Sequence, residues 1–327
     1  MTKLYYLKNK ANAIHIVTLY FILLVASVAS LLIGVKSILP NSVTLLKHSD
    51  LQILIISRVP RTVTLILTGA GLSICGIILQ QLSHNKFISP TTSGTLDSAK
   101  LGILFSLFLF PQYSVFTKLL FSVLFCFGFT LLFVFSITKL ANRNTVLIPI
   151  LGIMFGYTLN SISNLFGVEL NIVQNMESWM VGNFTKTLQG QYEIIYLMVP
   201  LFVICYLYAR KFTIASMGRD FSTSLGINYQ MVVIIGLILT SIMVSTTILT
   251  VGSLPFIDLI IPNIVAFIYG DNVRKNLPFT ACYGALALLI CDIVGRLIIY
   301  PYEIPVSMIV GSLGAVIFLI ILINRNR

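Results

Sequence analysis

Residues 230–250 read QMVVIIGLILTSIMVSTTILT, an apolar run with no charged side chain. A helix of about 20 mostly apolar residues is long enough to cross the roughly 30 Å hydrocarbon core of a bilayer. Runs of the same character lie on both sides of it, with little polar sequence between them. The sequence therefore predicts about ten membrane-spanning helices, at residues 14–35, 62–82, 94–110, 115–138, 145–167, 191–209, 230–250, 254–269, 278–299 and 304–323.

The composition of the whole chain also indicates a membrane environment. Of the 327 residues, 57% are hydrophobic and 9% are charged, whereas a soluble domain carries about 25% charged residues. This excludes a soluble enzyme, a nucleic-acid-binding protein and a secreted disulfide scaffold. Continuous apolar runs favour helices over a β-barrel, whose strands alternate over about 10 residues. No linker interrupts the series, so residues 1–327 are predicted to form a single domain of an all-α polytopic membrane protein.

Basic residues predict how the chain is oriented. With the N-terminus inside, 13 of the 21 Lys and Arg residues fall on the cytoplasmic side, 7 fall outside and 1 lies within a span. Because cytoplasmic loops carry an excess of Lys and Arg, both termini are predicted to lie inside. The five cysteines lie within apolar runs and form no CxxC pair, which predicts packed thiols.

Motifs that carry catalysis are missing from the sequence. No Gly is followed by Lys, so the chain has no P-loop to hold nucleotide phosphates, and any ATP must bind to another chain. The patterns HExxH and GxSxG and clusters of His or Cys are missing as well. We therefore expect no catalytic residue and no metal site, and the sequence argues against a membrane-embedded enzyme.

Ionisable side chains inside the predicted spans are few. The candidates for a functional role are Asp97 with Lys100, Asp258, and Asp292 with Arg296. A charge at mid-bilayer costs roughly 2.5–3.5 kcal/mol on insertion scales, so it is normally paired or functional. Asp97 and Lys100 stand at i, i+3, and Asp292 and Arg296 stand at i, i+4, so each pair can neutralise itself on one helix face. An ion-coupled secondary carrier more often has a chain of buried acids.

Five blocks of sequence follow one another from about residue 55 to the C-terminus. They are RVPRT at 58–62 with GAG at 69–71, Gly76, Gln80 and Asn85; WMVG at 179–182; MGRDFSTSLG at 217–226; GSLPFI at 252–257 with PN at 262–263; and Gly284-Ala285, Asp292, Arg296, EIP at 303–305, Gly311 and Gly314. In order and roughly in spacing, this series resembles the permease subunits of the ferric-siderophore and cobalamin family of type II ABC importers. Lys86, Asp258 and Asn263 depart from the Pro, Gly and His of the family pattern. The string SPTTSGTLDSAK at 89–100 is most similar to permeases for catecholate-type siderophores.

The resemblance implies a permease subunit that moves ferric siderophore, of the catecholate type, across the bacterial cytoplasmic membrane by alternating access. The family has ten spans with both termini inside, which agrees with the count and the charge bias above. The implied partners are two copies of a cytoplasmic ATP-binding subunit, an extracytoplasmic siderophore-binding protein, a second permease copy or paralogue, and membrane lipid, but no nucleic acid. ATP is expected on the partner subunit, and no cofactor on this chain. Cobalamin or haem import by the same architecture, and ion-coupled secondary transport, are the alternatives.

The resemblance also assigns a docking surface and a coupling surface. Docking of the binding protein is expected at Arg58, Arg61, Arg296 and Glu303, because arginines at the matching family positions meet partner carboxylates. Alternatively, these arginines only extend to the lipid interface, or Asp292 occupies Arg296. Coupling to the ATPase is expected in the cytoplasmic loop 210–229, folded as two short helices, with contacts at Gly218, Arg219, Asp220, Ser224, Leu225 and Gly226. A loop that is merely solvated is the alternative there.

The translocation pathway is expected along the fifth predicted span. Asn160, Ser161, Ser163 and Asn164 place amides and hydroxyls where exposure to lipid is unfavourable, so they should face protein or water. The family's fifth span lines the passage, which supports a pathway role, and ordinary interhelical hydrogen bonding is the alternative. Gly69 with Ser73, and Gly71 with Cys75, are small residues spaced to allow close helix contact.

Overall fold

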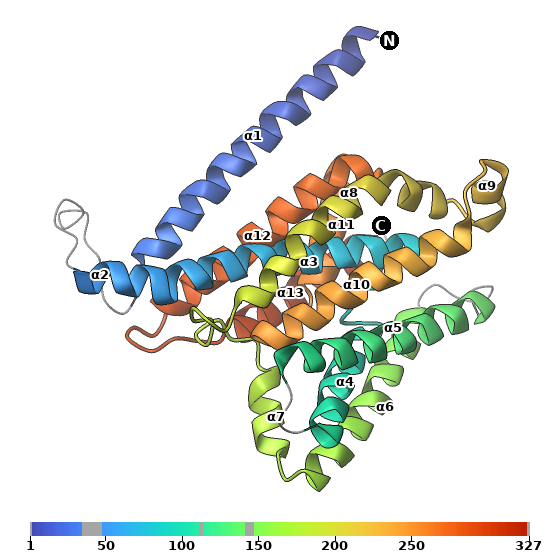
Figure 1. Ribbon diagram of the computed structural model, residues 1–327. Helices are drawn as coiled ribbons and strands as arrows, with labels where there is room; N and C mark the ends of the chain where they lie inside the picture. Colours follow the sequence, from blue (N-terminus) through green and yellow to red (C-terminus); the bar gives the residue numbers. More distant parts are fainter. Residues whose placement is uncertain (1, 35–47, 111–113, 141–146, 326–327) are drawn as a thin grey trace.

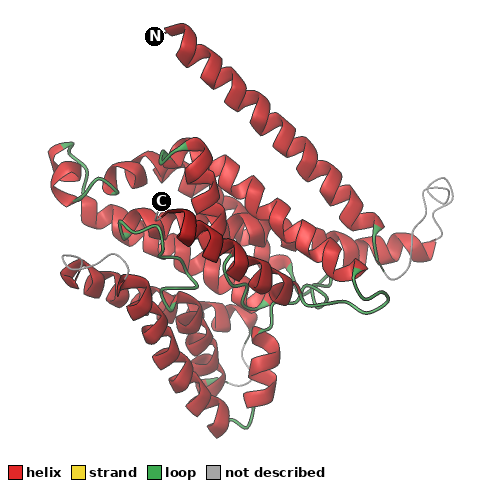
Figure 2. Ribbon diagram, turned by 180° about the vertical axis from the view of Figure 1, so that it is seen from behind, coloured by secondary structure: helices red, strands yellow, loops and turns green. Residues whose placement is uncertain are grey.

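The computed structural model describes residues 2–34, 48–110, 114–140 and 147–325 (Figures 1 and 2). Within these residues the regular structure is helical, apart from an isolated bridge between Val181 and Ser253. The helices are α1 (Thr2–Leu32), α2 (His48–Ile53), η2 (Leu54–Arg58), α3 (Val59–Leu82), α4 (Thr95–Leu109), α5 (Val115–Leu140), α6 (Leu147–Glu169), α7 (Val173–Met180), η3 (Glu193–Leu197), α8 (Met198–Ala215), α9 (Arg219–Ser224), α10 (Tyr229–Val251), α11 (Ile257–Tyr269), α12 (Val273–Leu297) and α13 (Val306–Arg325).

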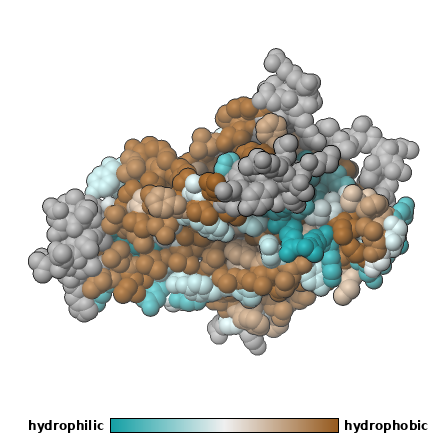
Figure 3. All heavy atoms as spheres, turned by 90° about the horizontal axis from the view of Figure 1, so that it is seen from above, coloured by the Kyte–Doolittle hydropathy of each residue, from teal (hydrophilic) through white to brown (hydrophobic). Residues whose placement is uncertain are grey.

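In the part of the chain that the structure describes, each range predicted to span the membrane overlaps a helix. Within the described residues, six helical stretches are long and apolar enough to cross a bilayer, namely 14–32, 51–82, 115–137, 193–215, 229–251 and 273–297. Residues 257–269 and 306–320 form shorter apolar helices. Hydrophobic residues cover most of the described surface visible in Figure 3, as expected for a chain whose outer face meets lipid.

The helix α3 runs through the middle of the bundle and contacts α8, α10, α11 and α12 (Figure 1). Glycines let its backbone approach its neighbours. A side-chain carbon added at Gly69 would overlap the carbonyl of Gly284 in α12, and one added at Gly76 would overlap the carbonyl of Asp258 in α11. Small residues at such crossings bring helices to backbone contact, so this part of the core depends on residues without side chains. The close contact predicted at Gly69 is confirmed.

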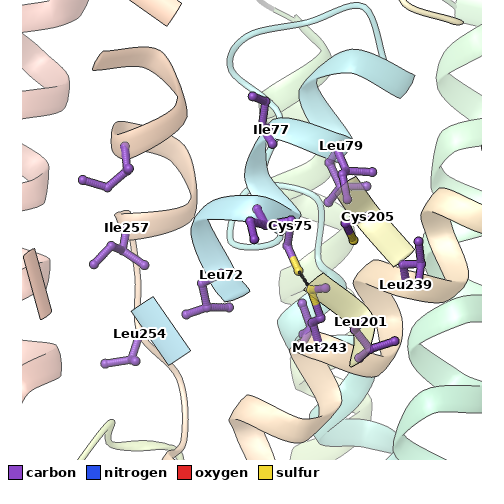
Figure 4. Close-up of a cluster of buried hydrophobic side chains, with 14 of the residues drawn as sticks. Leu72, Cys75, Ile77, Leu79, Leu201, Cys205, Leu239, Met243, Leu254 and Ile257 are labelled. Carbon is purple, nitrogen blue, oxygen red and sulfur yellow. Dashed lines mark hydrogen bonds between the residues drawn. The ribbon is translucent and has the colours of Figure 1, made fainter. Parts of the chain in front are cut away.

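Apolar side chains of α3, α8 and α10 fill the space around this crossing. Figure 4 shows Cys75 of α3 facing Met243 of α10, with Leu201 and Cys205 of α8 nearby. The Cys75 thiol lies 3.5 Å from the sulfur of Met243. All five cysteines are unbridged, four of them buried and one half-buried, so the prediction of packed thiols is confirmed.

The helices α4, α5 and α6 form a second packing group that α10 joins to the α3 core. At the opposite side of the molecule, α1 contacts α12 and then diverges toward the N-terminus (Figure 1). Few of its residues between 14 and 32 are buried in the chain. The helices α4, α6 and α7 lie on one side of α10, away from α1 (Figure 1), and the candidate site described below lies among them.

The three departures from the family pattern meet in one place. The hydroxyl and backbone N–H of Thr91, in the segment between α3 and α4, donate to the carboxylate of Asp258 at 2.7–2.8 Å. The Asn263 amide donates to the backbone carbonyl of Lys86 at 2.9 Å, and the Lys86 ammonium pairs with Asp271 at 2.7 Å. Lys86, Asp258 and Asn263 therefore link the segment before α4 to α11. This contact accounts for a fully buried acid within an apolar helix.

The backbone contact between α3 and α12 generates a first prediction. Gly284→Val puts methyl groups against the Gly69 carbonyl, which is backbone and cannot move aside. Overpacking of this kind costs about 3 kcal/mol. We expect the free energy of unfolding, measured by denaturant titration in detergent micelles, to fall by about that amount.

Gly128→Val in α5 is the matched control, since no other atom lies within 4 Å of an added carbon there. Its free energy of unfolding should stay within about 0.5 kcal/mol of the parent value, as for an exposed position. Equal losses in the two variants would contradict the packing argument.

Candidate functional site

Two of the sequence blocks come together as a backbone platform, which we define as residues 179–183, residues 251–255 and Ser307. The N–H of Ser253 donates to the Met180 carbonyl at 3.0 Å, and the N–H of Asn183 donates to the Val251 carbonyl at 3.0 Å. The N–H of Ser307, in α13, donates to the Gly182 carbonyl at 3.1 Å. The platform thus joins the ends of α7, α10 and α13.

Two glycines make this contact possible. Gly252 has a φ of +92°, a conformation that other residues rarely adopt, and a side-chain carbon added there would meet the carbonyls of residues 179–181. A side chain at Gly182 would meet the Ser253 carbonyl and the Ser307 side chain. The WxxG and GSLPF blocks are therefore one structural unit, which their separation in sequence does not reveal.

A cavity of about 380 Å³ lies beside the platform. Besides platform residues and Met308, it is lined by four polar or charged side chains from α4, α6 and α7, namely Asp97, Lys100, Asn160 and Glu177. Acidic and basic side chains that face a cavity between helices are typical of a substrate or ion pathway in a membrane protein. This cavity is our candidate functional site.

Lys100 is the central cation of this site. Its side chain crosses from α4 to α6, where the ammonium donates to the Asn160 amide oxygen at 2.8 Å. The same ammonium lies 3.5 Å from a carboxylate oxygen of Glu177 in α7. Lys100 makes no direct ion pair with Asp97, because the Asp97 carboxylate lies beside Gly156 of α6, although the two charges still interact at longer range.

The four polar residues predicted to line a pathway have different surroundings. Asn160 lines the cavity. Ser163 is buried and donates to the Leu159 carbonyl of its own helix. Ser161 and Asn164 are exposed on the surface of the isolated chain, and Ser161 donates to its own helix as well. The structure therefore brings one of the four together with Lys100.

Glu177 was missed by the sequence analysis. It is the only acidic residue of α7 and stands two positions before Trp179 of the WxxG block. Its position next to the WxxG block is the sequence feature that could have identified Glu177 as a candidate site residue. Lys100 lies 77 residues away along the chain, so nothing in the sequence indicated that it would contact Glu177.

A buried ionic network connects α3, α12 and the loop before α13. Arg61 donates to Asp292 at 2.6 Å and to Glu303 at 2.7 Å, and Asp292 also pairs with Arg296. Arg296 donates further to backbone carbonyls of Ser30 and Ile33, at the end of α1. The predicted pair between Asp292 and Arg296 is confirmed, and Arg61 joins it.

This network shows the surroundings of the residues expected to dock the binding protein. Arg58, Arg61 and Arg296 are each less than a tenth exposed, so they do not present guanidinium groups at the surface. Arg58 donates to the Leu31 and Leu32 carbonyls at 2.6 and 3.0 Å. A charged group buried beside lipid needs internal partners, and carboxylates and carbonyls of the chain supply them. The Glu303 side chain, 20% exposed, is also held by Arg61.

The loop between α8 and α10 holds one short helix, α9, and not the two that were predicted. Gly218 and Gly226, at its two ends, have φ values of +106° and +74°, as the predicted tight turns require. Arg219, Asp220 and Ser224 are exposed, and so are the apolar side chains Met217, Phe221 and Leu225. Apart from Leu225, these exposed apolar residues were not anticipated. Such residues outside the apolar spans indicate a contact surface.

The fold and this site define a class of membrane transport permease. The chain superposes with a TM-score of 0.79 on a metal-chelate type ABC transporter solved in an inward-facing conformation, at 22% sequence identity, with 94% of this chain and 98% of that one covered. This likeness establishes the fold. The model of the FecCD transport family matches residues 17–324, and the chain belongs to this family. The resemblance seen in the five sequence blocks is thereby confirmed.

Two curated relatives are more similar in sequence. The petrobactin import system permease protein YclN of Bacillus subtilis is 44% identical over 308 residues, with 94% of this chain and 98% of the relative covered. The ferric-anguibactin transport system permease protein FatD of Vibrio anguillarum is 43% identical over 274 residues, with 84% and 87% covered. These relatives are transport permeases and not enzymes, and the same holds for this chain.

The ionic network generates a second prediction. Arg61→Met removes the cation that neutralises Glu303 and shares Asp292, which is fully buried. Removing one partner of a buried ion pair costs about 3–5 kcal/mol. We expect the free energy of unfolding of the purified chain in detergent to fall by about 3 kcal/mol.

Lys86→Met is the matched control, because it breaks an ion pair of the same 2.7 Å length whose two side chains are 41% and 61% exposed. An exposed pair is worth about 1 kcal/mol or less. If Arg61→Met costs no more than Lys86→Met, the network does not stabilise the fold as described.

Proposed function

We propose that this chain is the permease subunit of an ATP-driven importer that moves ferric siderophore of the catecholate type across the bacterial cytoplasmic membrane. The observation that carries the proposal is 44% identity, over nearly the full length of both chains, to a permease named for petrobactin import. A second relative, named for ferric-anguibactin transport, supports the same substrate class. The block at 89–100 favours catecholate-type siderophores independently of these names.

The proposed arrangement has about ten spans, with both termini in the cytoplasm and residues 1–327 acting as one domain. It is supported by the helices found at each predicted range and by the excess of Lys and Arg on the side assigned to the cytoplasm. In this orientation the coupling loop containing α9 faces the cytoplasm, and the backbone platform lies toward the outside. The membrane is the bacterial inner membrane.

The proposed assembly supplies what the chain lacks. The sequence has no P-loop, so ATP binds to a separate cytoplasmic subunit, present in two copies, and the permease carries no cofactor. A second permease copy or a paralogue completes the passage, and a siderophore-binding protein delivers the ligand from outside. We propose that this binding protein docks at Arg58, Arg61, Arg296 and Glu303. The three arginines already donate to carbonyls and carboxylates within the chain. Carboxylates of the binding protein must therefore compete with these internal acceptors.

Reconstitution into proteoliposomes, with a candidate ATPase and a candidate siderophore-binding protein from the same organism, tests the proposal. Ferric petrobactin, presented by the binding protein, should stimulate ATP hydrolysis several-fold, and uptake of iron-55 should stop when the P-loop lysine of the ATPase is replaced. Cobalamin and haem should have no effect. Stimulation by cobalamin or haem alone, or uptake that persists without ATP and follows the proton gradient, would instead favour the alternative transporters.

The coupling role of α9 generates a further prediction. Gly226→Val places a branched residue at a φ of +74°, which costs about 1–3 kcal/mol of backbone strain. The turn should open and displace the exposed face of α9. We expect the amount of ATPase that co-purifies with the permease to fall at least tenfold.

Gly190→Val is the control, since Gly190 also has a positive φ and open space around it but lies in the loop before η3. It should retain the parental amount of ATPase. Retained co-purification in the Gly226 variant would contradict the assignment of the coupling loop.

A further inference from the structure

Lys100 is a buried cation whose ion-pair contact, among the described residues, is with an exposed carboxylate, while the half-buried Asp97 interacts with it only at longer range. Lys100 is 5% exposed and lies within the apolar helix α4. Its nearest carboxylate belongs to Glu177, whose side chain is 62% exposed and 3.5 Å away. The network around Asp292 is different, because there the carboxylate is fully buried and the contact with Arg61 is 2.6 Å. The ion pair of Asp292 is therefore short and buried, whereas that of Lys100 is longer and involves an exposed carboxylate.

The surroundings of Lys100 suit an aromatic anion. Its side chain borders the polar cavity of about 380 Å³. Lys100 also lines a smaller cavity of about 170 Å³, whose other lining residues are mainly apolar, with Met176 and Trp179 among them, and include a second cation, Lys118. An aryl ring that carries anionic oxygens can place its ring against such a wall and its oxygens at the ammonium. A Lys ammonium has three donors, and Asn160 takes one of them.

We infer that Lys100 is an anion-binding residue of the translocation pathway, which contacts a catecholate oxygen of the ferric chelate in place of the Glu177 carboxylate. The inference rests on the proposed function and names a residue that recognises the substrate class. Three catecholate dianions around one ferric ion carry a net charge of three minus, so the complex is attracted to an ammonium. Glu177, which is exposed, can turn toward water when the ligand arrives. Asp97 and Glu177 then repel the complex, which keeps the contact transient, as a pathway requires.

Uptake of iron-55-labelled ferric petrobactin into the proteoliposomes described above tests the inference. Loss of a charge-assisted hydrogen bond inside the protein reduces binding about tenfold or more. Lys100→Met should therefore lower the uptake rate at saturating binding protein at least tenfold, whereas Lys100→Arg should retain most of it. Glu177→Gln removes the carboxylate that competes for the ammonium and repels the complex, so the variant should bind the ferric complex more tightly than the parent and should not lose uptake as Lys100→Met does.

A purely structural ion pair predicts the opposite pattern. If Lys100 serves only to neutralise Glu177, then Glu177→Gln should lose as much uptake as Lys100→Met, and the double variant Lys100→Met/Glu177→Met should recover it. Either result overturns the inference. We expect the double variant to be as slow as Lys100→Met, with normal amounts of protein in the membrane.

The single tryptophan of the chain provides a second readout that needs no partner subunit. Trp179 lines the smaller cavity together with Lys100, so a coloured ferric complex bound there should quench its fluorescence. In nanodiscs containing the full chain, the ferric complex of three catechols should quench at a concentration at least tenfold lower for the parent than for Lys100→Met. The neutral ferric complex of three acetohydroxamates should not distinguish the two.

Equal quenching of parent and variant by the catechol complex overturns the inference. The two proposals can also fail separately. A parent that does not import ferric petrobactin contradicts the proposed function, while the quenching experiment still decides whether Lys100 binds the anionic complex.

Discussion

Hydrocarbon offers no hydrogen bonds, and this constraint explains most of the polar contacts in the molecule. A polar or charged group inside the bilayer must find its partner within the protein. Asp258 is satisfied by the hydroxyl and N–H of Thr91, and Asp292 by two guanidinium groups. Hydroxyls within the spans, such as that of Ser163, bond to carbonyls of their own helix. Lys100 differs from these acids, since it bonds to Asn160 but its nearest carboxylate, that of Glu177, is largely exposed.

The helices could be predicted from the sequence, because an apolar run of sufficient length has few other stable forms in a membrane. The partners of buried charges were harder to predict. Spacing correctly paired Asp292 with Arg296, four residues apart on one helix. The same reasoning failed for Lys100, because the tertiary structure offered Asn160 and Glu177, 60 and 77 residues away. Local periodicity carries no information about which helices become neighbours.

Recognition of sequence blocks supplied part of that missing information. The blocks at 179–182 and 252–257 were each identified from the sequence, yet their contact through the backbone platform was not. Likewise, Lys86, Asp258 and Asn263 looked like three separate departures from a pattern, and the structure joins them in the contact between α11 and the segment before α4. The exposed apolar residues Met217 and Phe221 were not anticipated, because a sequence alone does not tell which face of a short helix remains uncovered.

The backbone platform has a mechanical consequence for α10. This helix of 23 residues is about 35 Å long, and four residues separate its first residue from the last residue of α9. Its far end is held through Val251 to Asn183, and the adjoining Ser253 is held to Met180. An uninterrupted helix transmits displacement along its axis with little compression. We therefore expect a shift of α9 to displace the C-terminal end of α7 and the N-terminal end of α13, next to the cavity that contains Lys100.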